Sequence, residues 1–443
     1  MTSYRIVRVA PASYLEPIEA LYRADPALAE QSHRRQCEVF FGGHLGYSDS
    51  FARGMARLGH EAFELPFNVV PLQRAWARER GVRFRAADWK AEILLAQLKA
   101  LAPDVVYFQG VVPLDAGTRR SLKRICPSIR LVVFYNGFPE VPEEAADADL
   151  CLAGVPMILR LFRARGLRTE LLYHAFDDRV LEQPGLGRGG PGHDFTFVGT
   201  TGYGYRGIFA RRYRFLLELM RRAGLECWAR DHMVEVETLQ NALPAAWTLL
   251  AQCPGEVLER LRRERLLPMG ELNVGLYHLA VRALAEQGRR VEPLDPPLAP
   301  GPVPLCPDDP EPEVPLARMF PDRCREPLFG LAMFDLLRRS RLTFNIHTGT
   351  ADGECGNIRM FEATGVGTCL LTDAGSNLGD LFEAGREVAV YRDLEECVET
   401  ARWLLEHEEE RRAMARAGQR RTLREHTVAR RCAEVDAMVR RLL

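Results

Sequence analysis

Two glutamates, Glu354 and Glu362, stand in the last third of the 443-residue chain with seven residues between them. A carboxylate beside a phosphate is repelled by it, but it accepts hydrogen bonds from hydroxyl groups, such as those of a sugar or a ribose. The pair therefore suggests a ligand that carries both a phosphate and hydroxyl groups. A solvated, Glu-rich helix start explains the same spacing equally well.

The elements around the two glutamates support the first interpretation. The short apolar runs 341–347 and 368–372 read as buried strands. Between them we expect a glycine loop and a short helix that begins at Asn357 and ends at Gly365 or Gly367. This order of strand, loop, helix and strand aims backbone N–H groups and a positive helix end at a phosphate.

Composition limits the class of protein. Hydrophobic residues make up 47% and charged residues 27%, as in ordinary globular proteins of two or three domains. The net charge of −1 gives no basic field for nucleic acid. The 11 cysteines are scattered, and we see neither a secretory leader nor a run of transmembrane length, so we expect a cytoplasmic protein. No lysine follows Lys123, so a cationic clamp in the second half needs arginine, histidine or helix dipoles.

The first half alternates between strands and helices, which predicts a parallel sheet with helices on both faces. We expect a first domain at 1–184 with strands at 4–9, 37–41, 61–65, 103–108, 129–135, 149–153 and 169–173. Polar residues follow several of these strands, where clefts form in such sheets. His44 could act as a base or contact a donor sugar, or it could simply bond backbone. Asp49 could hold His44 or cap the next helix, and Gln109 and Asn136 could face an acceptor or satisfy turns.

Residues 185–192, which contain five glycines, read as a linker. The α/β pattern resumes in a second domain, 193–427, with a glycine-rich loop after the strand 194–198. Residues 293–327 carry 12 of the 28 prolines, so we treat about 233–327 as an insertion. A last helix, 428–443, completes the chain.

Metal ligands are not evident in this pattern. The Asp-x-Asp at 147–149 and the pair at 308–309 read as solvated loops. A diphosphate would then be stabilised by helix N-termini and arginine. The candidates for this donor side are Gly199, Thr200, Arg206, His347, Gly356, Asn357 and Arg359, with Glu362 for hydroxyl groups.

The C-terminal third resembles bacterial glycosyltransferases of the family-1-like group that is related to spore-maturation proteins. The similar blocks follow one another in the family's order: 342–347, 357–365, 370–373, 381–385, 387–392 and 417–427. The first half is similar more loosely, at 46–51 and 58–61, and 233–327 departs from the family pattern.

The resemblance implies an α/β fold of two facing Rossmann-like domains (GT-B type), with the nucleotide sugar on the second domain and the acceptor on the first. It also implies that the last helix crosses back to the first domain. Glu354 would contact donor-sugar hydroxyls in catalysis and Glu362 the nucleotide ribose, as in retaining members of this fold. No cofactor beyond the donor substrate is expected.

The acceptor stays open among a glycan, a lipid-linked glycan, a protein and a small molecule, as in glycan biosynthesis. The insertion could select the acceptor or mediate homo-oligomer formation. Two other classes remain: a nucleotide-sugar epimerase or phosphorylase of the same shape, and a non-catalytic sugar-nucleotide-binding scaffold. The absence of lysine after Lys123 weakens the phosphorylase, which would need one for pyridoxal phosphate. The glutamate pair weakens the scaffold.

Overall fold

The structure is a computed structural model that describes residues 3–12, 15–44, 48–110, 112–138, 141–202, 210–230, 254, 314–347 and 353–443. The chain forms two compact units, Met1–Phe197 with Leu328–Leu443 and Val198–Pro327. The predicted site residue Arg206 and most of the predicted insertion 233–327 lie outside the described residues. The domain boundaries expected from the sequence stay a proposal.

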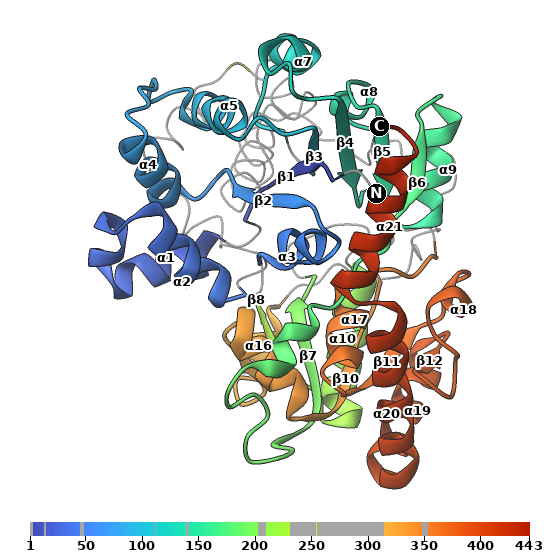
Figure 1. Ribbon diagram of the computed structural model, residues 1–443. Coiled ribbons are helices and arrows are strands. Elements are labelled where there is room, and N and C mark those ends of the chain that lie inside the picture. Colours follow the sequence, from blue (N-terminus) through green and yellow to red (C-terminus); the bar gives the residue numbers. More distant parts are fainter. Residues whose placement is uncertain are drawn as a thin grey trace. The chain divides into compact units, whose positions relative to one another are not determined.

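The first unit begins with a parallel sheet of six strands in the order β2-β1-β3-β4-β5-β6 (Figure 1). The order changes direction at β1, because the chain leaves it first for β2 on one side and then for β3 on the other. The strands are β1 Arg5–Ala10, β2 Glu61–Pro66, β3 Val105–Gln109, β4 Leu131–Asn136, β5 Leu150–Ala153 and β6 Thr169–Leu171.

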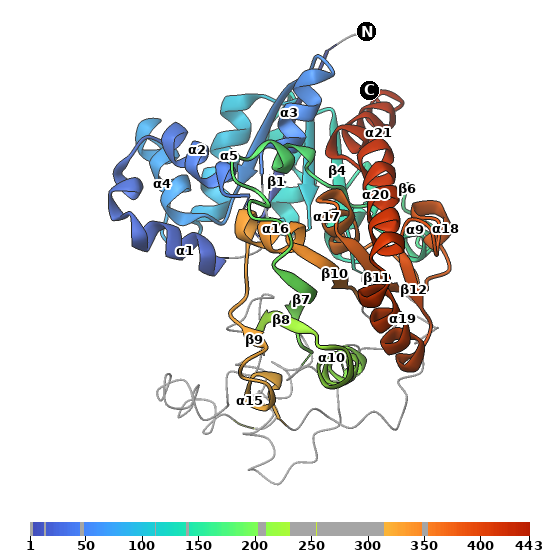
Figure 2. The same cartoon turned by 90° about the horizontal axis from the view of Figure 1, so that it is seen from below.

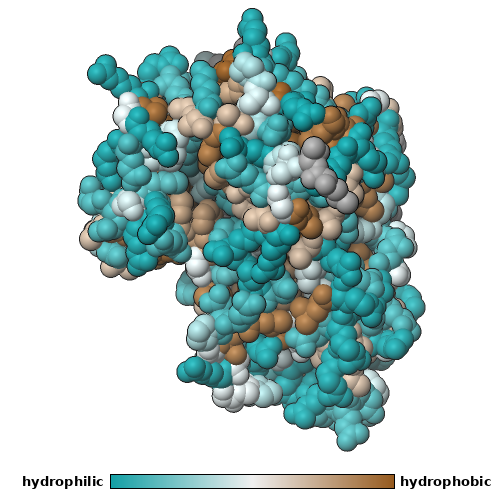
Figure 3. All heavy atoms as spheres, viewed as in Figure 1, coloured by the Kyte–Doolittle hydropathy of each residue, from teal (hydrophilic) through white to brown (hydrophobic). Residues whose placement is uncertain are grey.

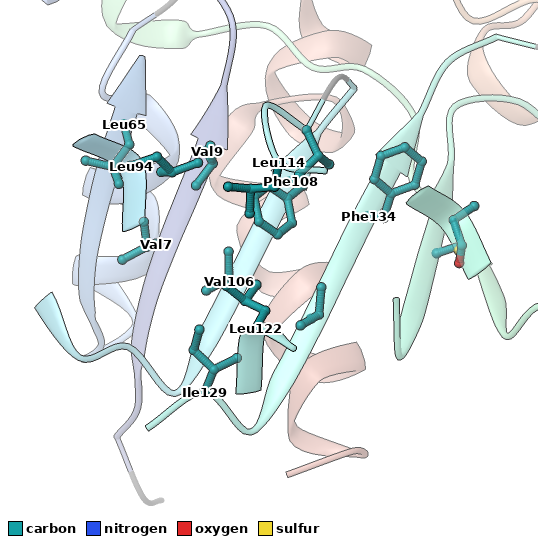
Figure 4. Close-up of a cluster of buried hydrophobic side chains, with 14 of the residues drawn as sticks. Val7, Val9, Leu65, Leu94, Val106, Phe108, Leu114, Leu122, Ile129 and Phe134 are labelled. Atoms are coloured by element: carbon teal, nitrogen blue, oxygen red, sulfur yellow. The ribbon is translucent and has the colours of Figure 1, made fainter. Parts of the chain in front are cut away.

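Alternating side chains of this sheet are buried on both faces, as expected for a doubly wound sheet. One face carries Val7, Val106 and Phe134 (Figure 4). These side chains pack with helices that include α5 (Trp89–Leu101) and α9 (Pro156–Ala164). The smaller helices α6 Ala116–Arg120, α7 Leu122–Ile125 and α8 Glu143–Ala146 lie in the connections between β3 and β5.

The opposite face of the first sheet is covered by helices from the two ends of the chain. Ile6, Tyr107 and Val133 pack there with α3 (Ser50–Arg57) and α21 (Val428–Arg440). The crossing back of the chain is fixed by a parallel bridge between Phe176 and Thr427. Helix α21 thus completes the core of a sheet whose strands lie more than 250 residues earlier.

A second set of parallel strands in the first unit runs in the order β12-β11-β10-β7, and Figures 1 and 2 show them side by side. They are β7 His193–Thr200, which crosses the unit boundary, β10 Ser340–Phe344, β11 Cys369–Asp373 and β12 Ala389–Tyr391. The helices with them are α16 Gly330–Arg338, α17 Ile358–Gly365, α18 Leu378–Leu381, α19 Leu394–Glu406 and α20 Glu408–Glu425. The two parallel sheets confirm the predicted α/β class with two Rossmann-like domains.

The second unit contributes fewer described elements. Its strands β8 (Glu226–Arg230) and β9 (Cys324–Arg325) pair in parallel. Helix α10 (Ala210–Ala223) is held near α15 (Leu316–Met319) by Tyr213, whose hydroxyl donates to the carbonyl of Val314 at 2.5 Å.

One predicted strand is wrong. Residues 37–41 belong to helix α2 (His33–Gly42), which Ser32 caps by accepting the N–H of Arg35 at 3.2 Å. Gln36 and Phe40, four residues apart, are buried on one side of this helix. The aromatic and β-branched run misled the prediction because it fits a strand equally well. His44 therefore follows a helix and not a strand.

Four helical segments precede β3 besides α3 and α5. Helix α1 (Leu15–Ala24) comes first, and the short 3₁₀ helix Pro26–Glu30 follows it after a break at the proline. Helix α4 (Val70–Glu79) had not been predicted.

On the face drawn in Figure 3, hydrophilic residues dominate and hydrophobic residues form small separate groups. In the described ranges, the helices are all too short or too polar to cross a bilayer.

Candidate functional site

The start of helix α17 is tied to the ends of β10 and β11 by side-chain amides. Asn357 occupies the N-cap position but makes no capping bond. Its Nδ2 donates instead to Oδ1 of Asn345 at 2.8 Å, and Asn345 donates onward to the hydroxyl of Thr372 at 2.9 Å. The helix start is thereby held in place by buried polar contacts rather than by a cap.

His347 links the same loop to Asp373 at the end of β11. Nδ1 of His347 lies 2.7 Å from the Asp373 carboxylate, and its Nε2 accepts the N–H of Gly356 at 3.2 Å. Burial lowers the pKa of His347, and the Asp373 charge raises it by more. The net upward shift in pKa, to about 10, favours the imidazolium, in which Nε2 also carries a proton, whereas the bond from Gly356 needs an unprotonated Nε2. In both forms Nδ1 carries the proton that faces Asp373.

These contacts limit which amides of the loop are open to a ligand. The N–H of Gly356 is taken by His347, and that of Cys355 is taken by Oδ1 of Asn377 at 2.6 Å. Of the amides expected to hold a diphosphate, Gly356 is therefore already engaged. Those of Asn357 and Ile358 remain at the positive end of α17.

Glu354 is nearly buried, with 4% of its surface exposed. One carboxylate oxygen accepts the backbone N–H of Met157 at 2.5 Å, and the other accepts Nη2 of Arg160 at 2.8 Å. Both partners belong to the first turns of α9. The predicted catalytic glutamate thus lies at the N-terminus of a helix from the first sheet, where a negative charge is favourable.

Glu362 lies on the second turn of α17 and pairs with Arg359, whose Nη1 is 2.8 Å from its carboxylate. Burial raises the pKa of Glu362, and the charge of Arg359 opposes this shift. Arg359 therefore faces Glu362 and not open solvent. A buried carboxylate with a spare acceptor oxygen suits hydroxyl groups.

Three glycines bring the connecting loops into close contact. A Cβ at Gly356 would lie 2.7 Å from a methyl group of Val155 and 3.3 Å from the carbonyl oxygen of Gly154. A Cβ at Gly154 would lie 3.5 Å from the Cα of Gly137. The Glu354 loop, the β5 exit and the β4 exit therefore touch one another in a row.

His44 is held by Asp177 rather than by Asp49. Its Nδ1 lies 3.3 Å from the Asp177 carboxylate, which also accepts hydroxyl groups from Ser48 and Ser50. The backbone of His44 is left-handed, with φ 50°. Burial raises the pKa of Asp177, but the hydrogen bonds it accepts lower it by more, so its net shift is downward.

The predicted alternatives for Asp49 are both replaced by ion pairs. Asp49 makes no capping bond to α3 and contacts Arg53 at 2.6 Å and Arg179 at 2.9 Å. Arg179 in turn contacts Asp177 at 3.1 Å. The cluster around His44 is therefore anchored by Arg179, which no motif in the sequence singles out.

The two strand-end amides of the first sheet also have partners. Gln109 accepts Nη1 of Arg8 at 3.1 Å. The side chain of Asn136 donates to the carbonyl of Phe138 at 2.9 Å and accepts its N–H at 3.1 Å. Asn136 thus satisfies a turn, one of the two roles expected for it.

Gly199 and Thr200 belong to the second unit. The hydroxyl of Thr200 accepts Nη1 of Arg212 at 2.7 Å. Arg212 sits on α10, so it ties that helix to the end of β7.

Sequence reasoning missed Asp177, Asp373, Asn345 and Arg160. Asp373 and Asn345 lie in the similar blocks, so position after a strand could have suggested them. Asp177 and Arg160 are separated from their partners by more than 100 residues, and no spacing relates them. Within the described part of the chain, no group of three or more His, Cys, Asp or Glu side chains is placed to bind a metal ion.

Comparisons with known proteins locate the similarity in the same region. Residues 310–437 match the model of the family described as "Glycosyl transferase-like". No curated protein matches the sequence.

Solved structures match over the whole chain. A glycosyltransferase from Rickettsia africae ESF-5 aligns with TM-score 0.51 and 7% identity over 100% of this chain and 99% of that one. Sucrose-phosphate synthase (tll1590) from Thermosynechococcus elongatus aligns with TM-score 0.50 and 9% identity over 99% of each chain. The chain thus has the two-sheet GT-B fold, and its C-terminal part is similar to the glycosyl transferase-like family.

Proposed function

We propose that the chain is a glycosyltransferase that moves a sugar from a nucleotide-sugar donor to an acceptor hydroxyl. The observation that carries the proposal is the placing of Glu354 and Glu362 on either side of the α17 start, inside the region that matches the glycosyl transferase-like family. A helix start between two carboxylates combines a phosphate site with acceptors for hydroxyl groups.

In this proposal Glu362 binds the ribose of the donor. Its carboxylate is oriented by Arg359, and burial of its charge makes a hydrogen bond from a ribose hydroxyl favourable. The amides of Asn357 and Ile358, at the positive end of α17, stabilise the diphosphate without a metal ion. His347 acts indirectly, because it fixes the loop through Gly356.

Glu354 is proposed to contact hydroxyls of the donor sugar and to support a retaining reaction. Its two oxygens each accept one bond from α9, which leaves further lone pairs for a sugar hydroxyl. His44, oriented by Asp177, is the candidate base or sugar contact on the acceptor side.

The test is melting temperature against a panel of nucleoside diphosphates and nucleotide sugars, in the wild type and in Glu362→Ala. A ligand at 100 times its Kd adds about 2.7 kcal/mol to the free energy of unfolding. We expect one nucleotide to raise the melting temperature and Glu362→Ala to weaken that shift.

The control is Glu399→Ala, which removes an exposed glutamate of α19 and should leave the shift unchanged. If no nucleotide raises the melting temperature, the donor site is wrong and a scaffold role replaces it. The anomer of sugar released by slow donor hydrolysis, read by NMR, tests retention: release with inverted configuration contradicts it.

A further inference from the structure

Phe138 follows strand β4 and is 57% exposed, the largest exposed fraction among the large apolar side chains in the described part of the chain. A single exposed aromatic residue needs no explanation by itself. Phe138 differs from an ordinary exposed aromatic residue in its position and in the hydrogen bonds that hold its backbone.

The backbone of Phe138 is fixed from beneath by Asn136. The side-chain amide of Asn136 bonds both the N–H and the carbonyl of Phe138, and only 6% of Asn136 is exposed. A buried amide that satisfies both backbone groups of one residue restrains that residue's orientation. The ring is thus presented on a fixed turn, so a ligand that stacks on it orders little else.

The turn is connected by direct contact to the Glu354 loop. Gly137, next to Phe138, packs against Gly154, and Gly154 packs against Gly356. Gly356 lies two residues after Glu354. A ligand on the Phe138 ring would therefore lie along the row of loops that ends at the proposed donor-sugar contact.

This turn is also at the carboxyl end of the first sheet, the edge at which parallel α/β sheets bind their ligands. Arg160, which pairs with Glu354 at the other end of this row, is 63% exposed. One aromatic ring beside polar groups fits a ligand with alternating apolar and hydroxyl surface. A lipid chain would instead need a continuous apolar patch.

We infer that Phe138 is a stacking platform for a sugar ring of the acceptor, so that the acceptor of this enzyme is a glycan. The C–H face of a pyranose covers the aromatic ring, and the ring's hydroxyls stay free for polar neighbours. This inference rests on the proposed function, because it names the acceptor class of the same site.

The experiment is saturation-transfer NMR of the full chain with three disaccharides, cellobiose, maltose and lactose, each titrated to obtain a Kd. We expect at least one to bind the wild type through its ring C–H protons. Phe138→Ala should raise the Kd of that disaccharide by about fivefold to tenfold, because the loss of one aromatic stacking contact weakens binding by about that factor. Phe138→Trp should restore binding, because a larger aromatic face remains.

Leu58→Ala is the matched control, since Leu58 is an apolar side chain of the same half that is 40% exposed. It should leave disaccharide binding unchanged. Equal binding by the wild type and Phe138→Ala overturns the inference, and so does the absence of binding by all three disaccharides.

The nucleotide panel separates this inference from the proposed function. Phe138→Ala should keep the wild-type shift in melting temperature with nucleotide. A nucleotide shift without Phe138-dependent disaccharide binding rejects the platform alone. Phe138-dependent binding without any nucleotide shift keeps the platform and rejects the donor site.

Discussion

The carboxylate of Glu354 accepts the backbone N–H of Met157 at 2.5 Å, although the two residues are almost 200 positions apart. The bond joins the loop before α17 to the first turn of α9. A residue proposed to touch the donor sugar is thus also the partner of a helix from the other sheet. The contribution of Glu354 to folding stability and its contribution to activity therefore have to be measured separately.

Replacing Glu354 by alanine should lower the free energy of unfolding by about 2–3 kcal/mol. The change leaves the Met157 N–H and the Arg160 guanidinium without their charged partner and empties a buried volume. Urea unfolding measures the loss. Glu383→Ala, an exposed glutamate paired with Arg386, should change stability by less than about 0.5 kcal/mol. Equal losses would show that the α9 contact contributes nothing.

Gly365→Ala should destabilise the protein by about 1–3 kcal/mol, because its Cβ would lie 2.4 Å from the buried ring of Phe176. The double variant with Phe176→Ala should lose less than the sum of the single losses, since the two residues are in contact. Gly379→Ala is the control, because its Cβ meets nothing within 4 Å. Additive losses in the double variant would argue against a direct clash.

Protonation of His426 should lower the free energy of unfolding in mild acid. Burial, followed by the nearby charge of Arg431, lowers its pKa to about 4 in the folded state, whereas an unfolded chain has about 6.5. Its stabilising effect is therefore complete above pH 6.5 and is lost as the pH falls toward 4, because only the unfolded state takes up the proton. The loss is on the order of 3 kcal/mol.

Urea unfolding at pH 7.5, 6, 5 and 4 checks this slope. The variant His426→Gln keeps a donor for the carbonyl of Leu381 and cannot titrate, so its stability should depend less on pH in this range. His174, whose pKa burial also lowers to about 4, remains in both proteins and accounts for the slope that is left. Parallel slopes in the two proteins would assign the effect to other groups.

Asp177→Asn should cost about 3 kcal/mol at pH 7, because it removes the charge that Arg179 and the hydroxyl of Ser48 contact. Asp49 contacts the same arginine but is more exposed, so Asp49→Asn should lower the free energy of unfolding by about 1 kcal/mol or less. Urea unfolding compares the two. If Asp49→Asn is the more damaging change, the anchoring of His44 is assigned to the wrong carboxylate.

Strands and helices of both sheets were predictable where an apolar run ended in glycine, asparagine or proline. Strands β3, β4 and β10 have this pattern and are buried on both faces. Residues 37–41 failed because the burial of Gln36 and Phe40 on one helix side is visible only across a longer window.

The partners of the candidate site were harder to predict. The sequence placed Glu354, Glu362 and His347 near one glycine loop, because their spacing along the chain is short. It could not pair His44 with Asp177, since that contact depends on how a late connection packs against the start of α3. Spacing predicts neighbours within one element, whereas contacts between elements depend on tertiary packing.

Helix α21 bears on how the protein is made. Its residues Cys432, Val435 and Val439 cover one face of the first sheet. They complete a buried cluster that also contains Tyr4, Phe51 and Met55 from the start of the chain. A ribosome therefore completes all six strands of that sheet long before it delivers their cover. Until then an apolar face is open to chaperones and to other nascent chains, so the yield of folded protein should depend on the rate at which α21 is synthesised.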